Sequence, residues 1–311
     1  MGPHYAFFRE REIDWTETVE AARANVTPTI DDAELFAVLE DLLAPFGDTH
    51  VTIEAEIDRR EESISGTDER TPAEPDGEPV VSGAWSAHAA QELLGASARQ
   101  DGDDTLIYGL LANDVGYLQI QSMAGMEPSG LEAALDEAIT AFEKAKAVVV
   151  DVSENYGGLD SFARRIARRF AAEPTVAYSK YAGDFEGDRP QEIVLSPPDR
   201  PRYLGPVYLI TSHDTVSAAE IFTMSMRALP NVVHLGETTD GSLSDQLWKT
   251  LPNGWRLSLS NEVYLDSEGV LWEGRGIPPE IPLAISEDDD ISQNDQQSVL
   301  DLLDFIRAQL G

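Results

Sequence analysis

Short apolar runs that alternate with helix-like spacing constrain the fold of this 311-residue chain most strongly. Three such runs lie at 148–152, 207–210 and 232–235. A near-continuous series of valine, leucine and isoleucine is typical of strands buried on both faces. Helical spacing follows the first run at Phe162, Ile166 and Phe170. A succession of strand-helix units predicts an α/β layer built on a largely parallel sheet.

Further elements are expected on both sides of these units. The alternation at 115–120 predicts another strand. A capping box formed by Ser129 and Glu132 predicts where the following helix begins. A closing helix is expected around 299–306, where apolar residues recur with helical spacing.

The chain is predicted to have three parts. They are a helical segment at 1–51, an acidic linker or insertion at 52–107 and an α/β core at 108–311. In the first part, Asp31 or Asp32 can cap the second of two helices. From Glu54 to Gly83 the chain is rich in Glu, Asp, Pro, Ser and Gly without periodicity, so we expect no regular structure there.

The charge balance is strongly acidic. Fifty-seven Asp and Glu residues against 22 Lys and Arg give a formal net charge of −35. Repulsion of this size destabilises a compact state in dilute buffer and is relieved by screening, which indicates adaptation to a saline environment. No basic patch is recognised that could neutralise phosphates, which argues against nucleic acid and against an anionic membrane surface as partners.

Two absences in the sequence narrow the chemistry and the compartment. The chain has no cysteine, which excludes disulfides, a thiol nucleophile and thiolate metal ligands. No apolar run reaches the length of a membrane span, and the start of the chain is too polar for a signal peptide. The chain as written is therefore predicted to be cytoplasmic, and a longer chain with a leader would be extracytoplasmic.

The first chemical signal is a serine behind a buried strand. Ser217 lies in the segment 211–222, which directly follows the run at 207–210. A serine that opens a helix there can aim its hydroxyl and the next backbone N–H, that of Ala218, at one substrate carbonyl. Ser217 is therefore the candidate nucleophile. The competing interpretation is that Thr215 and Ser217 only cap the helix.

A second signal is the glycine pair Gly157 and Gly158, which lies between the run at 148–152 and the next helix pattern. Paired glycines at a strand-to-helix junction let the backbone turn tightly and present N–H groups to an anion. On their own they would indicate only a turn. Beside the serine loop of a neighbouring unit, one of them is predicted to supply the second oxyanion donor.

Four motifs in order resemble the core of the tail-specific (C-terminal processing) serine peptidases. They are Asp-Val-Ser-Glu-Asn-Tyr-Gly-Gly at 151–158, Thr-Val-Ser-Ala-Ala-Glu-Ile-Phe at 215–222, Gly-Glu-Thr-Thr-Asp-Gly at 236–241 and Glu-Gly-Arg-Gly-Ile-Pro-Pro-Glu-Ile at 273–281. The tricorn core protease and the repeats of interphotoreceptor retinoid-binding protein belong to the same family. Residues 5–51 further resemble the helical segment of the tricorn-like branch. The resemblance implies a ClpP/crotonase-like α/β core with an N-terminal helical bundle segment.

The resemblance also implies catalytic roles. In the tricorn-like branch a histidine acts as base and acid, and His50 matches it, with Thr49 in place of the neighbouring serine. Glu273 matches a glutamate that orients this network. Imidazole suits the task because its unperturbed pKa of about 6.5 lets it accept and return a proton near neutrality.

Two other bases were weighed against His50. The bacterial branch uses a lysine after the glycine that Gly241 matches, but Ser242 occupies that place here. Lys249 lies nearby in sequence and is expected at an exposed strand position, so we do not expect a serine-lysine pair. His213, four residues before Ser217, is the second choice.

The activity implied by the resemblance is that of an endopeptidase-type serine peptidase that needs no metal or cofactor. It would form an acyl-enzyme with peptides or unfolded segments, held as an added strand along the core. The sequence leaves homo-oligomerisation open. The alternative is an inactive module that carries a small apolar ligand, as in the retinoid-binding relatives.

Overall fold

The computed structural model describes residues 4–57, 60–65, 77, 79–101, 105–183, 189–286 and 292–310. The chain divides into two units, and each is considered by itself. The first unit takes residues 1–71, 180–191 and 244–264, and the second takes 72–179, 192–243 and 265–311. No helix within the described ranges combines the length and the apolar character needed to cross a bilayer.

A seven-stranded sheet organises the second unit, with the order β14-β10-β9-β6-β5-β4-β3. Its strands are β3 (Arg99–Gln100), β4 (Leu106–Leu111), β5 (Val115–Ile120), β6 (Ala147–Asp151), β9 (Val207–Thr211), β10 (Val232–Gly236) and β14 (Ile281–Pro282). Neighbours from β5 to β14 pair in parallel, whereas β3 and β4 are antiparallel. Every residue of β5, β6 and β9 is buried, which explains their continuous apolar character.

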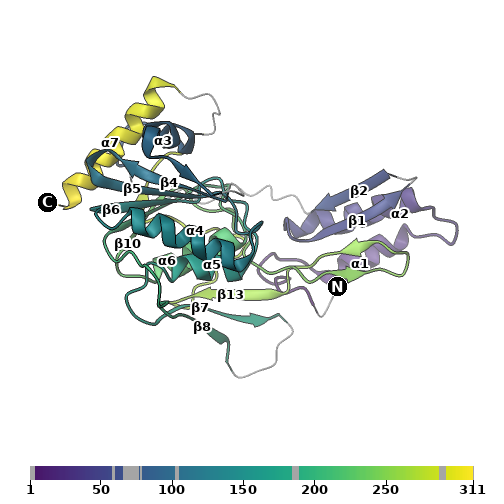
Figure 1. Cartoon of the computed structure of the whole chain (residues 1–311). Coiled ribbons are helices and arrows are strands. Elements are labelled where there is room, and N and C mark those ends of the chain that lie inside the picture. The colour runs from purple at the N-terminus through teal and green to yellow at the C-terminus, as the bar shows by residue number, and fades with distance from the viewer. Residues whose placement is uncertain are drawn as a thin grey trace. The chain divides into compact units, whose positions relative to one another are not determined.

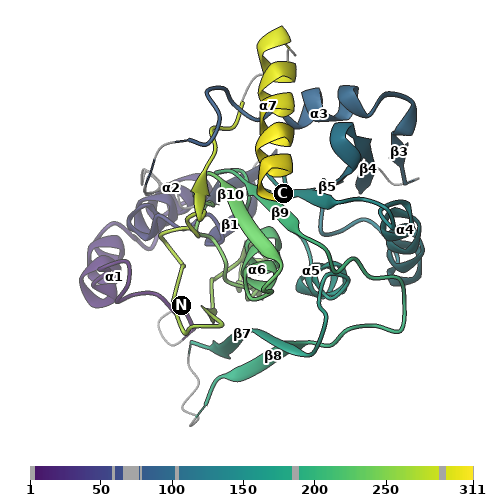
Figure 2. The ribbon, with the colours of Figure 1, turned by 90° about the vertical axis from the view of Figure 1, so that its left-hand side faces the viewer.

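Helices cover both faces of this sheet. Figures 1 and 2 show α4 (Pro128–Ala141), α5 (Asp160–Ala167) and α6 (Ala218–Arg227) on one face, and α3 (Ala87–Leu94) and α7 (Gln293–Leu310) on the other. Trp85, Tyr117 and Tyr208 form one hydrophobic cluster with Leu302 and Leu303 of α7. Short 3₁₀ turns lie at Ala44–Phe46, Gly95–Ser97 and Ala112–Asp114. The predicted parallel sheet and closing helix are therefore confirmed.

The first unit combines two helices and a small antiparallel sheet. Its elements are α1 (Trp15–Ala24), α2 (Asp32–Leu43), β1 (Thr52–Ile57), β2 (Arg60–Ser65), β11 (Lys249–Thr250) and β12 (Arg256–Leu257), with the sheet order β11-β12-β1-β2. Asp31 caps α2, because its carboxylate accepts the Glu34 N–H at 2.8 Å while the Glu34 carboxylate accepts the Asp31 N–H at 3.3 Å.

A third sheet has the order β13-β7-β8. It is formed by β7 (Thr175–Ala182), β8 (Gln191–Leu195) and β13 (Glu262–Asp266). The division between the units passes through these strands, and residues 192–195 of β8 belong to the second unit. Sequence periodicity did not indicate any of the three.

Two local expectations differ from the structure. Strands β1 and β2 occupy much of 52–65, where no regular structure was expected beyond Glu54. In β1 only Ile53 and Ala55 are buried, among acidic neighbours, so the alternation is too short to be recognised. Most of the remaining linker up to residue 78 lies outside the described residues. The expected capping box at Ser129 is also wrong, since Glu127 is the N-cap of α4 and Pro128 begins the helix.

Candidate active site

Ser217 stands at the junction between β9 and α6 in an unusual backbone conformation. It is the residue before Ala218, where α6 begins, with φ 58° and ψ −122°. An ordinary N-cap serine has extended dihedrals, and a positive φ costs a non-glycine residue about 1–2 kcal/mol. Ser217 is only half-buried. Its backbone therefore departs from that of a simple capping residue and holds a serine at the surface.

Hydrogen bonds fix the loop that leads from β9 to Ser217. Thr215 Oγ1 donates to the carbonyl of Val152 at 2.8 Å and accepts the Ser212 N–H at 3.0 Å. The Ser212 hydroxyl donates to the carbonyl of Ser153. The Val216 N–H donates to the carbonyl of Asn155 at 3.0 Å. The loop after β9 is thus tied to the loop after β6, the neighbouring parallel strand.

The glycine pair after β6 lies directly against the serine turn. A Cβ built on Gly157 would lie 2.7 Å from Cβ of Ser217 and 2.9 Å from the backbone nitrogen of Ala218. Gly157 has φ 94° and Gly158 has φ 142°, which side chains rarely permit. The structure therefore brings together the glycine pair and the serine, as the sequence predicted from adjacent strand-helix units.

The two glycines differ in what their N–H groups do. The Gly157 N–H donates to Oδ1 of Asn155 at 2.9 Å. Asn155 is fully buried and its Nδ2 donates to the carbonyl of Ile120 at 2.6 Å, which fixes the acceptor in place. The Gly157 N–H is therefore engaged within the loop, a difference between Gly157 and Gly158 that cannot be predicted from the glycine pair alone.

Glu220, on the first turn of α6, is a functional candidate that the sequence analysis missed. It is fully buried, and its carboxylate accepts four hydrogen bonds. The donors are the N–H of Ser217 at 3.2 Å, the Thr239 hydroxyl at 2.6 Å, and the N–H groups of Gly241 and Ser242, each at 2.8 Å. Burial raises the pKa of Glu220 to about 8, although the hydrogen bonds from Thr239 and Gly241 oppose that rise.

Glu220 therefore joins the serine turn to the loop at 236–241. The signal that could have revealed it is the spacing Ser-x-x-Glu, in which the acid reaches back to the N-cap backbone N–H. That spacing was present at Ser217 and Glu220 but was overlooked in favour of the serine itself.

Glu273 is buried beside the same loop. Its carboxylate accepts the Leu243 N–H at 2.9 Å, and only 5% of its surface is exposed. The segments around it are closely joined, because the Gly274 N–H donates to the carbonyl of Gly241 at 2.7 Å. Glu273 is thus not a solvated loop acid, and it shares the second unit with Ser217 and Glu220.

Thr49 and His50 belong to the first unit. The buried Asp48 carboxylate accepts the His50 N–H at 3.0 Å, the Ser260 hydroxyl at 3.1 Å and the Tyr5 hydroxyl at 3.0 Å. The carbonyl of His50 accepts the Ser258 hydroxyl at 2.6 Å. Within the described residues, the buried Nδ1 of His50 has no hydrogen-bond partner. Because each unit is considered by itself, the pairing of His50 with Ser217 stays a prediction.

The rival bases occupy other environments. The side chain of His213 is 49% exposed and lies 3.8 Å from the Glu237 carboxylate. Both line a cavity of about 600 Å³ together with Tyr156 and Asp214. Lys249 lies on β11 in the first unit and is half-buried, not exposed as expected. Among the described residues, no three or more His, Cys, Asp or Glu side chains are grouped to hold a metal ion.

Comparison with known proteins agrees with this geometry. The model of peptidase family S41 matches residues 114–283, more than half of the chain. The chain belongs to peptidase family S41. The carboxy-terminal processing protease CtpA of Bacillus subtilis (strain 168) is 27% identical over 180 residues, which are 57% of this chain and 37% of that protein. The chain thus spans little more than a third of the length of this relative.

Solved structures extend the likeness to almost the whole chain. A crystal structure from Parabacteroides merdae ATCC 43184 has a TM-score of 0.77 and 27% identity, and the match covers 98% of this chain and 92% of that one. The photosystem II D1 C-terminal processing protease has a TM-score of 0.56 and 14% identity, and the match covers 90% of this chain and 89% of that one. The tricorn protease has a TM-score of 0.53 and 15% identity, and the match covers 98% of this chain and 37% of that one. The predicted ClpP/crotonase-like α/β core with an N-terminal helical segment is confirmed.

Proposed function

We propose that this chain is a serine peptidase in which Ser217 attacks a peptide carbonyl. The Ser217 hydroxyl gives up its proton as its oxygen bonds to the carbonyl carbon, and collapse of the tetrahedral intermediate releases the amine and leaves an acyl-enzyme. Water then hydrolyses the ester. The observation that carries the proposal is the half-buried Ser217 at φ 58°, with the backbone of Gly157 packed on its Cβ.

The oxyanion donors follow from the same contacts. Ala218 supplies an N–H next to the nucleophile, and the glycine loop supplies the other. Since the Gly157 N–H already donates to Asn155, we assign the second donor to Gly158 and give Gly157 the role of allowing close approach. Removal of one oxyanion-hole donor typically costs about 2.7–4 kcal/mol of transition-state stabilisation.

We assign the general base to His50, oriented by Thr49 and Glu273. A histidine can take the serine proton and return it to the leaving amine. The peptide groups of His50 are anchored to Asp48 and Ser258, whereas its Nδ1 has no partner within the described residues. An orienting group at Nδ1 would fix the tautomer in which Nε2 accepts the proton. Peptides or unfolded segments of proteins are the proposed substrates.

Labelling with a fluorophosphonate tests the nucleophile. The probe forms a covalent bond only with an activated serine, so the wild-type protein should be labelled and Ser217→Ala should not. Ser267→Ala, which removes an exposed serine, is the matched control and should be labelled like wild type. Peptide hydrolysis by Ser217→Ala should fall at least about 1000-fold. An unlabelled wild-type protein would instead support the binding module.

A comparison of histidine variants tests the base. His50→Ala should lower kcat nearly as far as Ser217→Ala, and the double variant should be little worse, because residues of one nucleophilic unit are not additive. His213→Ala serves as the control and should lower kcat only slightly. A large loss in His213→Ala with a mild one in His50→Ala would reassign the base.

A further inference from the structure

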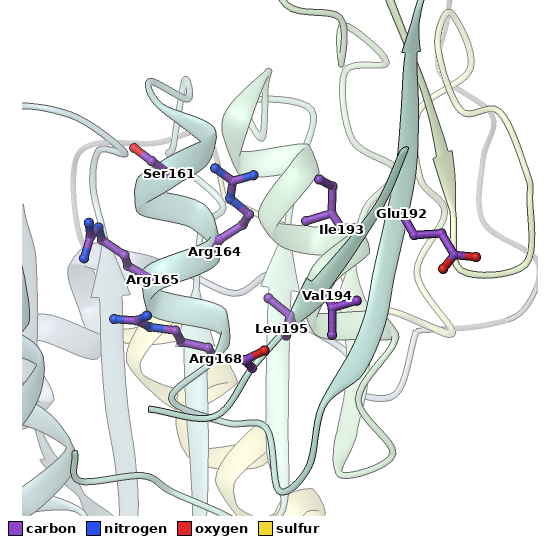
Figure 3. Close-up of a pocket in the computed structure, with 9 residues that line it drawn as sticks. Ser161, Arg164, Arg165, Arg168, Glu192, Ile193, Val194 and Leu195 are labelled. Atoms are coloured by element: carbon purple, nitrogen blue, oxygen red, sulfur yellow. The ribbon is translucent and has the colours of Figure 1, made fainter. Parts of the chain in front are cut away.

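A groove lies between α5 and β8. It is lined by Ser161, Arg164 and Arg165 of α5, by Arg168 directly after this helix, and by five consecutive residues, 192–196, of β8 and its end (Figure 3). Its volume is about 390 Å³. None of these residues belongs to the serine, glycine or glutamate motifs described above. The proposed catalytic chemistry therefore leaves this groove without a role.

The groove has an excess of positive charge in a chain whose formal net charge is −35. The Glu132 carboxylate pairs with Arg165 at 3.0 Å, with Arg169 at 2.7 Å and also with Arg168. Asp136 pairs with Arg169 at 2.6 Å and with Arg200 at 2.5 Å. Two carboxylates thus serve four arginines, of which Arg165 and Arg168 line the groove, so the cluster beside it has a surplus of two positive charges.

Arg164 adds to this surplus. It forms no ion pair within the described residues. In Figure 3 its side chain points from α5 towards β8, whereas the Glu192 side chain points away on the other side of the strand. The acid on the strand therefore does not neutralise the arginine in the groove. Arg164, Arg165 and Arg168 lie within five consecutive residues of the sequence, so the expectation that the chain has no basic patch does not hold at this helix.

The other wall of the groove is an edge strand. β8 is the last strand of its sheet among the described residues. Ile193 and Leu195 are buried, whereas Val194 is 45% exposed, so the strand is anchored on one face. Pro190 precedes it, and Pro197 and Pro198 follow shortly after its end. An edge strand offers unpaired main-chain N–H and C=O groups, which can bind an extended peptide as an additional strand.

We propose that this groove binds an extended acidic segment of a polypeptide substrate. The main chain of the segment adds to the edge of β8, and its carboxylate side chains bind Arg164, Arg165 and Arg168. Guanidinium groups bind carboxylates through paired, charge-assisted hydrogen bonds, which favours acidic over neutral segments. This inference rests on the proposed peptidase function only in taking the segment to be part of a substrate.

Direct binding to Ser217→Ala tests the groove without turnover. A fluorescein-labelled octapeptide of alternating Asp and Val is titrated with the protein and followed by anisotropy. Arg164→Gln combined with Arg165→Gln should weaken binding at least about 10-fold, while Arg168 and Arg169 continue to neutralise Glu132. Arg23→Gln combined with Arg307→Gln removes the same charge from exposed positions elsewhere and should change little.

Two altered peptides separate the charge from the strand. The same peptide with Asn in place of Asp should bind at least about 10-fold more weakly, because it lacks the carboxylates. N-methylation of alternate peptide nitrogens should weaken binding similarly, because it removes the donors of a strand ladder. Increasing potassium chloride should weaken binding of the acidic peptide more strongly to Ser217→Ala than to the same protein with the double arginine change.

Several results would overturn the inference. Equal affinity of the double arginine variant and its control for the acidic peptide would exclude the groove. Equal affinity for the N-methylated peptide would exclude strand addition. Because binding is measured in Ser217→Ala, absence of hydrolysis by the wild type would overturn the proposed function but leave these titrations valid. Conversely, hydrolysis without groove-dependent binding would reject only this inference.

Discussion

Two strand-to-helix turns, one after β6 and one after β9, meet at the candidate site and use opposite solutions to the same geometric problem. Both follow neighbouring parallel strands, and both contain residues with positive φ. The first uses Gly157 and Gly158, which adopt such angles at no steric cost. The second uses Ser217, which bears a steric cost that glycine would avoid. The difference indicates that a side chain at position 217 is worth that cost.

The two turns are also held in different ways. At the glycine turn the distinctive constraint is space, because atoms of Ser217 and Ala218 occupy the position that a Gly157 side chain would need. At the serine turn the Ser217 N–H donates to the buried Glu220, whose carboxylate also accepts hydrogen bonds from Thr239, Gly241 and Ser242. One turn should therefore be sensitive to added volume, and the other to loss of a single acceptor.

The largest effect on stability is expected at Glu220. Glu220→Ala removes the acceptor of four donors in a buried site, and each unsatisfied donor costs about 1–3 kcal/mol. Partial relaxation leaves an expected loss of at least about 3 kcal/mol in the free energy of unfolding. Urea denaturation at fixed molar salt measures it. Glu143→Ala, at an exposed site, should change stability by less than about 0.5 kcal/mol. Similar losses in the two variants would show that the Glu220 network does not stabilise the turn.

A smaller loss is expected from Gly157→Ala. The added Cβ lies 2.7 Å from Cβ of Ser217 and 2.8 Å from the carbonyl oxygen of Val216, and φ is 94°. Strain and displacement together should cost about 2–3 kcal/mol of stability. Peptide hydrolysis should fall at least about 100-fold, because the nucleophile moves relative to the oxyanion donors.

Gly269→Ala is the matched control for this change. Gly269 has a similar φ of 82°, but an added Cβ would meet nothing within 4 Å. Gly269→Ala should therefore lose only about 1 kcal/mol of stability and retain peptide hydrolysis. If Gly157→Ala and Gly269→Ala behave alike in both measurements, contact with the serine turn has no consequence beyond backbone strain.

The comparison also explains which features the sequence could predict. Strands β6 and β9 were recognisable because burial on both faces makes nearly every residue apolar. β8 was not recognised, since only Ile193 and Leu195 are buried and the other residues of the strand are exposed. β1 was missed because only Ile53 and Ala55 are buried in it, and because one of its two partner strands, β12, lies about 200 positions away, as in the pairing of Ile53 with Leu257. Local periodicity carries no record of such pairing.

The residues of the candidate site differ in the same way in how far local sequence pattern predicts them. Ser217 and the glycine pair follow buried strands, so their meeting could be inferred from local pattern and the adjacency of parallel strands. The roles of Glu220 and Asn155 depend on partners that are distant in sequence. Glu220 accepts a hydrogen bond from the Gly241 N–H, and Asn155 donates one to the carbonyl of Ile120. The assignment of His50 as base came from family resemblance and remains a prediction that its variants test.

The smallest expected effect compares the two turns most directly, because Ser217→Gly gives the serine turn the residue that the other turn already uses. Relief of the strain at φ 58° should contribute about 1–2 kcal/mol, and the greater freedom of glycine in the unfolded chain should offset about 0.5–1 kcal/mol of it. Ser217→Gly should therefore be about 0.5–1 kcal/mol more stable than Ser217→Ala, with hydrolysis lost in both. Ser267→Gly and Ser267→Ala form the matched pair at an exposed residue that is not among those with positive φ, and there glycine should be the less stable of the two. The same order in both pairs would mean that the backbone at Ser217 is not strained, and the cost inferred for holding a hydroxyl at this turn would have to be withdrawn.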